Sequence, residues 1–73
     1  MTAQEWVEEF AGEIGLTPPD QEQMDAILDL AAEAAHSSER TAAPIACWMA
    51  GVSGRPFSEL ADAAQRVGAS PGS

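Results

Sequence analysis

Apolar residues recur at three- and four-residue steps in four separate segments, and this spacing constrains the fold more than any other feature of the chain. Positions three and four apart share one face of an α-helix, so each segment predicts a helix with one face to bury. Glycine, proline or a polar run separates successive segments, and no stretch alternates in the manner of a strand. The sequence therefore predicts an all-α fold, a compact four-helix domain with short loops.

The first helix is expected to begin at a capping box and to end near Ile14. In Thr2-Ala3-Gln4-Glu5, the Thr2 hydroxyl can accept from the Glu5 amide while the Glu5 side chain reaches back. Gly15 supplies the left-handed residue that closes this helix. The second helix is expected to start within Thr17-Pro18-Pro19-Asp20, because a first helical turn tolerates proline.

The third helix is expected to start at Pro44, and its two faces differ in size. One face is bulky and the other is small: Ile45, Trp48, Met49 and Val52 against Ala46, Cys47, Ala50 and Gly51. Because small side chains let another backbone approach closely, we expect this helix to be central and covered on both sides. The fourth helix follows Gly54-Arg55-Pro56 and completes a single domain over residues 1–67. Residues 68–73 are expected to form a flexible tail.

The net charge is −9, since twelve acidic residues stand against three arginines and no lysine. This balance argues against binding to nucleic acid or to an anionic membrane surface, which both attract basic proteins. Residues 1–39 hold ten of the acidic residues and no basic one. Four of these acids share one face of the second helix: Glu22, Asp25, Asp29 and Glu33. Two interpretations stay open, a solvated face that keeps the protein soluble or a docking face for a basic protein partner.

Reactive residues are few. A single cysteine cannot build a disulfide framework, which suits a cytoplasmic protein, and no apolar run approaches the roughly 18 residues of a membrane span. One histidine and one cysteine do not make a metal site, so no metal and no cofactor is expected. Cys47 lies on an uncharged helix with no base placed beside it, so we expect no catalytic activity.

The segment His36-Ser37-Ser38-Glu39-Arg40-Thr41 is the most informative part of the chain, and two interpretations of it remain. In the structural one, His36 interacts with the C-terminus of the second helix, and Arg40 neutralises a nearby glutamate. In the functional one, Arg40, the Thr41 hydroxyl and the free amides of the third helix converge on a phosphate, with His36 as a further donor. Glu39 belongs to the same turn.

The strings Ala35-His36, Glu39-Arg40 and Ala42-Ala43-Pro44-Ile45, followed by Gly51 and Gly54-Arg55-Pro56, resemble a small actinobacterial family of helical domains. Some of its uncharacterised members are joined to a molybdenum cofactor guanylyltransferase. The resemblance covers about residues 5–67. Thr41 stands where many relatives have proline, which leaves the turn less rigid. The resemblance implies an accessory role near molybdopterin guanine dinucleotide synthesis, with His36, Glu39 and Arg40 as the residues of interest.

Together these observations predict a non-catalytic, cytoplasmic domain that binds a protein partner, and the resemblance implies a role in molybdenum cofactor biosynthesis. The acidic helix faces or the exposed part of the Trp48 helix would make the contact. The alternative is a module that binds a nucleotide or pterin phosphate at the His36–Thr41 turn. Formation of a homodimer through the small face of the third helix is left open.

Overall fold

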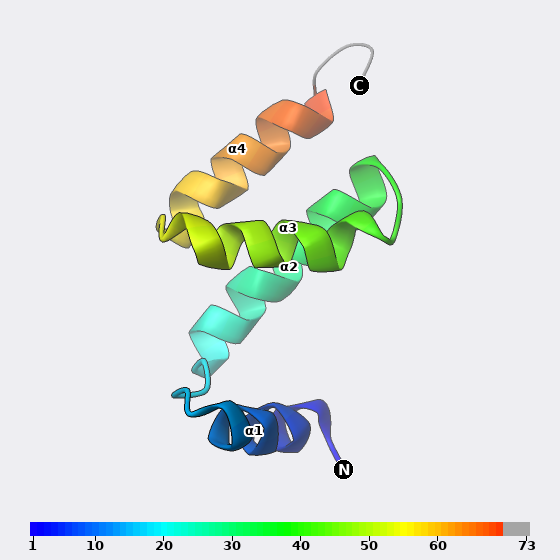
Figure 1. The fold of residues 1–73 in the computed structure, drawn as a ribbon. Coiled ribbons are helices and arrows are strands. Elements are labelled where there is room, and N and C mark those ends of the chain that lie inside the picture. The colour runs from blue at the N-terminus through cyan, green and yellow to red at the C-terminus, as the bar shows by residue number, and fades with distance from the viewer. Residues whose placement is uncertain (70–73) are drawn as a thin grey trace.

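The computed structural model describes residues 1–69 and confirms the predicted all-α domain of four helices joined by short loops (Figure 1). The helices are α1 (Ala3–Ile14), α2 (Gln21–Ser37), α3 (Ala42–Ser53) and α4 (Phe57–Ala69). α4 extends two residues past the expected end of the domain at Val67, so Gly68 and Ala69 are helical. The rest of the predicted flexible tail, residues 70–73, lies outside the described residues.

Both ends of α1 form as the sequence predicts. The Glu5 amide donates to the Thr2 hydroxyl at 3.1 Å, and the Thr2 amide donates to the Glu5 carboxylate at 3.0 Å. The hydrogen bond from the Thr2 amide favours the ionised carboxylate and lowers the pKa of Glu5, and the Thr2 side chain is the smaller cause of this shift. At the other end, Gly15 takes a left-handed conformation with φ of 73°, and the Leu16 amide donates to the Ala11 carbonyl at 2.8 Å.

The starts of α2 and α3 differ from the expectation. α2 begins after the two prolines, because Asp20 caps it in a second capping box with Gln23. α3 begins at Ala42 rather than at Pro44, because the Ala42 and Ala43 amides donate back to carbonyls of the preceding turn. Proline is still tolerated there, since Pro44 remains within the first helical turn, where amides lack an intrahelical acceptor.

α2 is the central helix, and the expectation that the third helix is central was wrong. α3 and α4 both pack on α2, and these three helices form a compact unit. Figure 1 shows α3 crossing α2, with α4 diverging from α3 beyond the loop that joins them. The small residues Ala46, Cys47 and Ala50 of α3 are half-buried, and Cys47 contacts the Ile27 carbonyl of α2. Its bulky face is exposed, with Ile45, Trp48, Met49 and Val52 between 59% and 69% accessible. α3 is therefore covered on one side.

α1 lies at one end of the molecule, across the start of α2 (Figure 1). Within residues 1–69, α1 does not pack closely on any other helix, whereas α3 and α4 both pack on α2. Trp6 and Phe10 stack on each other with ring centroids 5.0 Å apart, yet both side chains are about half exposed, as is Ile14. The apolar face of α1 is therefore formed without a partner helix to cover it.

Candidate functional site

The His36–Thr41 segment connects α2 to α3 and is exposed throughout. His36 lies in the last turn of α2, and Thr41 is the residue before α3. The hydroxyls of Ser37 and Ser38 donate to the Glu33 and Ala34 carbonyls one turn earlier, at 2.7 and 2.8 Å. In the described part of the chain, Arg40 forms no ion pair, so it does not neutralise a neighbouring glutamate as expected.

The arrangement at the start of α3 does not favour the predicted phosphate site. The Ala42 amide donates to the Glu39 carbonyl at 2.9 Å, and the Ala43 amide donates to the Arg40 carbonyl at 3.1 Å. The Thr41 side chain forms no capping hydrogen bond, and its backbone is helical. Two of the amides that would have bound an anion are therefore already engaged, and within residues 1–69 no hydrogen bond joins His36 to Arg40.

A groove of about 1030 Å³ lies between α3 and α4, with the C-terminal half of α2 as its floor. Its walls are mainly alanine and larger aliphatic residues. The apolar lining comprises Leu30, Ala34, Ala42, Ile45, Ala46, Met49, Ala50, Leu60, Ala63, Ala64 and Val67. Glu39 and Thr41 contribute to the lining next to the start of α3, and Arg55 contributes next to its end. The sequence interpretation missed this groove, although the alanines on all three helices were a usable signal.

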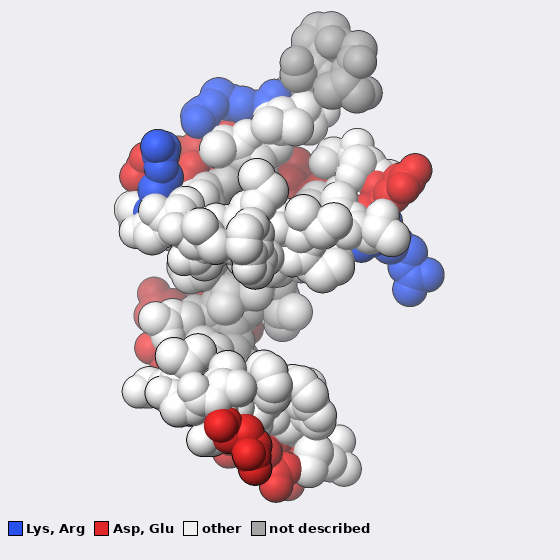
Figure 2. All heavy atoms as spheres, viewed as in Figure 1, with Lys and Arg blue, Asp and Glu red and all other residues white. Residues whose placement is uncertain are grey.

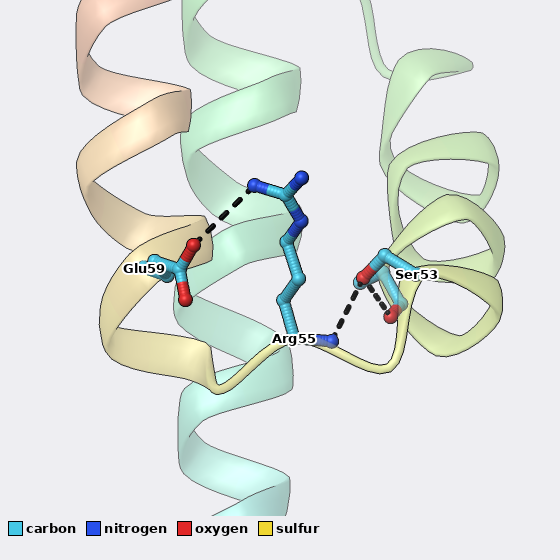
Figure 3. A network of polar contacts seen from close by, with 4 residues as sticks. Ser53, Arg55 and Glu59 are labelled. Carbon is cyan, nitrogen blue, oxygen red and sulfur yellow. Dashed lines mark hydrogen bonds and ion pairs between the residues drawn. The ribbon is translucent and has the colours of Figure 1, made fainter.

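Arg55 is held in place at the end of the groove where α3 meets α4. Its Nη1 contacts Glu59 Oε1 at 3.3 Å, and its amide donates to the Ser53 hydroxyl at 3.2 Å (Figure 3). The Ser53 hydroxyl in turn donates to the Ala50 carbonyl. This network closes the C-terminus of α3 and leaves an exposed guanidinium at the groove.

Trp48, the one aromatic candidate for partner contact, lies on the outer face of α3 and is 69% exposed. Figure 2 shows an uncharged surface across the middle of the molecule, over α3. Trp48 and Val52 do not line the groove, whereas Ile45 and Met49 do. The exposed apolar surface therefore continues from the groove over its edge onto the outer face of α3.

The four acids predicted as a docking face are not equally available. Glu22 and Asp25 are exposed near the start of α2. Asp29 is also exposed but borders a smaller hollow between α2 and α4, and Glu33 is half-buried there. A Cβ at Gly68 of α4 would lie 3.0 Å from Glu33 Oε1. Half of this face thus adjoins a neighbouring helix.

Cys47 is half-buried, and its Sγ lies 4.0 Å from the Ile27 carbonyl oxygen of α2. This position is typical of a cysteine that packs between two helices. No group of three metal-ligating side chains occurs within residues 1–69. Over the same residues, no helix has the length and hydropathy that crossing a membrane requires.

Comparison with protein families identifies a match over residues 1–70 to a domain of unknown function, DUF6457. The chain belongs to the DUF6457 family. The match covers nearly the whole DUF6457 chain and agrees with the resemblance to an uncharacterised family of helical domains. No curated protein and no solved structure is significantly similar to it.

Proposed function

We propose that this DUF6457 domain is a non-catalytic protein-interaction domain that binds its partner through the outer face of α3, centred on Trp48. The observation that carries the proposal is the exposure of Trp48 (69%) and Val52 (65%) on the face of an uncharged helix that lies outside the groove. Contiguous apolar patches of this kind are uncommon on soluble monomers and mark interaction sites. Tryptophan is also among the residues that contribute most to binding free energy at interfaces.

The partner that we propose is a molybdenum cofactor guanylyltransferase, in a cytoplasmic setting. Support for this choice comes from the resemblance of the His36–Pro56 region to domains joined to that enzyme. The net charge of −9 supports a partner with a basic surface, since opposite charges accelerate association and fix its orientation. Exposed Glu22 and Asp25 are the acids of α2 best placed to contribute.

The non-catalytic part of the proposal is supported by the surroundings of the reactive side chains. Cys47 contacts a backbone carbonyl of α2, and His36 is exposed in the turn that leaves α2. Over residues 1–69 no hydrogen bond joins the two side chains, so this conformation provides no nucleophile and base pair.

Calorimetric titration of the domain with purified guanylyltransferase tests the proposal. Trp48→Ala is expected to weaken binding by roughly tenfold or more, because a central aromatic anchor is removed. Leu28→Ala is the matched control, because Leu28 is a comparably exposed apolar residue (62%) on a different helix. Affinity is expected to fall as ionic strength rises.

Three results would contradict the proposal. They are the absence of binding at millimolar concentrations, equal affinity for Trp48→Ala and the unaltered domain, and equal loss of affinity in Trp48→Ala and Leu28→Ala. The first would reject this partner, and the other two would reject the contact surface.

A further inference from the structure

The isolated chain buries too little surface for a folded domain of its size. Its accessible surface is 5721 Å². A folded monomer of 7.6 kDa is expected to expose about 4300 Å², so the excess is about 1400 Å². A standard protein interface buries about 800 Å² on each partner, which this excess can supply. Within residues 1–68 the only buried apolar residue is Ala11, which is 6% accessible.

Two features leave apolar surface uncovered, an apolar ridge and an apolar groove. The ridge is the face of α1 that carries Trp6, Phe10 and Ile14, which are about half exposed. The groove lies between α3 and α4, as described above. α1 and α3 are both 12 residues long, or about 18 Å, so the ridge matches the length of the groove wall.

We propose that two copies of this chain form a closed dimer in which α1 of each copy lies in the groove of the other. Trp6, Phe10 and Ile14 of one copy would pack against Leu30, Ile45 and Met49 of its partner. The same contact occurs twice about a two-fold axis, and this reciprocity closes the assembly at two chains. The alanines along the groove leave room for a fourth helix at normal interhelical distance.

The linker between α1 and α2 favours insertion of α1 into the groove of a second copy over insertion into the groove of its own chain. Thr17 and Pro18 each precede a proline, which restricts both residues to extended conformations. The proline rings also fix φ at Pro18 and Pro19. A stiff, extended linker holds α1 away from the C-terminal half of α2, where the groove lies, and presents its apolar face to another molecule.

The charges around the two features are compatible with one orientation of α1 in the groove. Arg55 lies at the end of the groove near the C-terminus of α3, and Glu39 lies near the N-terminus of α3. If α1 runs parallel to α3, Glu13 in the last turn of α1 approaches Arg55. The N-terminus of α1, which carries the positive end of the helix dipole, then approaches Glu39. The antiparallel orientation would bring the negative end of α1 toward Glu39.

Sedimentation equilibrium of the full chain, from about 1 µM to about 1 mM, tests the proposal through the mass of the particle. We expect the mass to rise with concentration from 7.6 kDa to twice that value. Phe10→Glu alters the ridge, and Ile45→Arg alters the groove. Each variant is expected to remain monomeric where the unaltered chain is dimeric. Both side chains are exposed (48% and 61%), so both variants are expected to fold, which far-ultraviolet circular dichroism checks.

An equimolar mixture of Phe10→Glu and Ile45→Arg is expected to recover the dimer. One of its two contacts is unaltered, and the other brings the new carboxylate to the new guanidinium. This recovery separates the exchanged dimer from other dimers. A dimer built on α1 alone would persist in Ile45→Arg, and a dimer built on α3 alone would persist in Phe10→Glu.

Leu28→Glu and Val52→Arg are the matched controls, since both residues are exposed and neither lines the groove. Both controls are expected to dimerise like the unaltered chain. A monomeric mass for the unaltered chain up to about 1 mM would overturn the proposal. So would a dimer of either single variant alone, or a mixture of the two that stays monomeric. None of these measurements involves guanylyltransferase, so they are independent of the proposed function.

Discussion

Gly68 is the glycine in the described helices that is held most closely by a neighbouring helix. A Cβ at this position would lie 3.0 Å from Glu33 Oε1 and 3.3 Å from Ser37 Cβ. The Glu33 carboxylate can move aside, but Ser37 Cβ is fixed to the backbone of α2. By contrast, a Cβ at Gly51 of α3 would meet nothing within 4 Å. One substitution at two helical glycines therefore has two different outcomes.

We expect Gly51→Ala to raise the free energy of unfolding by about 0.5–1 kcal/mol, because alanine is the better helix former. Gly68→Ala is expected to raise it by less or to lower it, since α4 must shift away from Ser37. Urea denaturation of the two variants and the unaltered chain measures the difference. An equal gain from both substitutions would show that α4 does not approach α2 this closely.

The capping box gives α1 a predictable response to acid. The pKa of Glu5 is lowered below its ordinary value of 4.5, so the ionised form stabilises the folded helix. This stabilisation is complete above pH 4.5 and is lost as the pH falls through the lowered pKa. A side-chain NMR titration is expected to place the midpoint for Glu5 below 4.5.

Thr2→Ala is expected to move the Glu5 midpoint only partly back toward 4.5. The substitution removes the hydroxyl but keeps the Thr2 amide, which is the larger cause of the shift. Thr2→Ser keeps both donors and serves as the control. A midpoint at 4.5 in the unaltered chain would mean that the capping box does not form in solution.

At the scale of elements, the sequence predicted the features that depend on residues close in the chain and missed those that depend on packing between helices. The caps at Thr2 and Gly15 form as predicted because each depends on residues within one turn. The central helix was wrongly predicted because α2 and α3 both carry small residues. The spacing of these residues does not show which of the two helices packs against two neighbours. The groove was missed for a related reason, since it depends on the angle at which α3 and α4 diverge.

The candidate site was predictable only in part. The exposure of His36, Glu39 and Arg40 follows from a polar turn between two helices. Their convergence on a phosphate required free amides at the start of α3. Because α3 begins at Ala42, two residues before Pro44, carbonyls of the turn take those amides. A shift of two residues in a helix boundary therefore changes the chemistry that the turn can support.

The linker between α1 and α2 provides a prediction at the same scale. Replacing Pro18 and Pro19 by glycine frees the backbone, so α1 gains conformations in which it reaches its own groove. We expect the double variant to dimerise at least several-fold more weakly than the unaltered chain. Sedimentation equilibrium measures the change, and Pro56→Gly, which alters a different loop, is the control. Unchanged dimerisation of the double variant would show that linker stiffness plays no part.

At the scale of the whole molecule, exchange of α1 makes stability depend on protein concentration. Association with a second folded copy stabilises the native state by mass action. The thermal midpoint is expected to rise by a few degrees for each tenfold increase in concentration, since about 1 kcal/mol shifts the midpoint of a small domain by about 4–8 °C. Phe10→Glu should abolish this dependence in differential scanning calorimetry. A midpoint that is independent of concentration in the unaltered chain would be incompatible with the exchanged dimer.

The uneven distribution of charge has a consequence for how the molecule orients. Residues 1–39 carry ten carboxylates and no arginine, whereas residues 40–73 carry three guanidiniums and two carboxylates. The chain is therefore an electric dipole as well as an anion. A positively charged resin would capture it by the first two helices and leave α3 facing outward. Immobilisation on such a resin would display the Trp48 face of α3 uniformly, without a tag or a chemical coupling step.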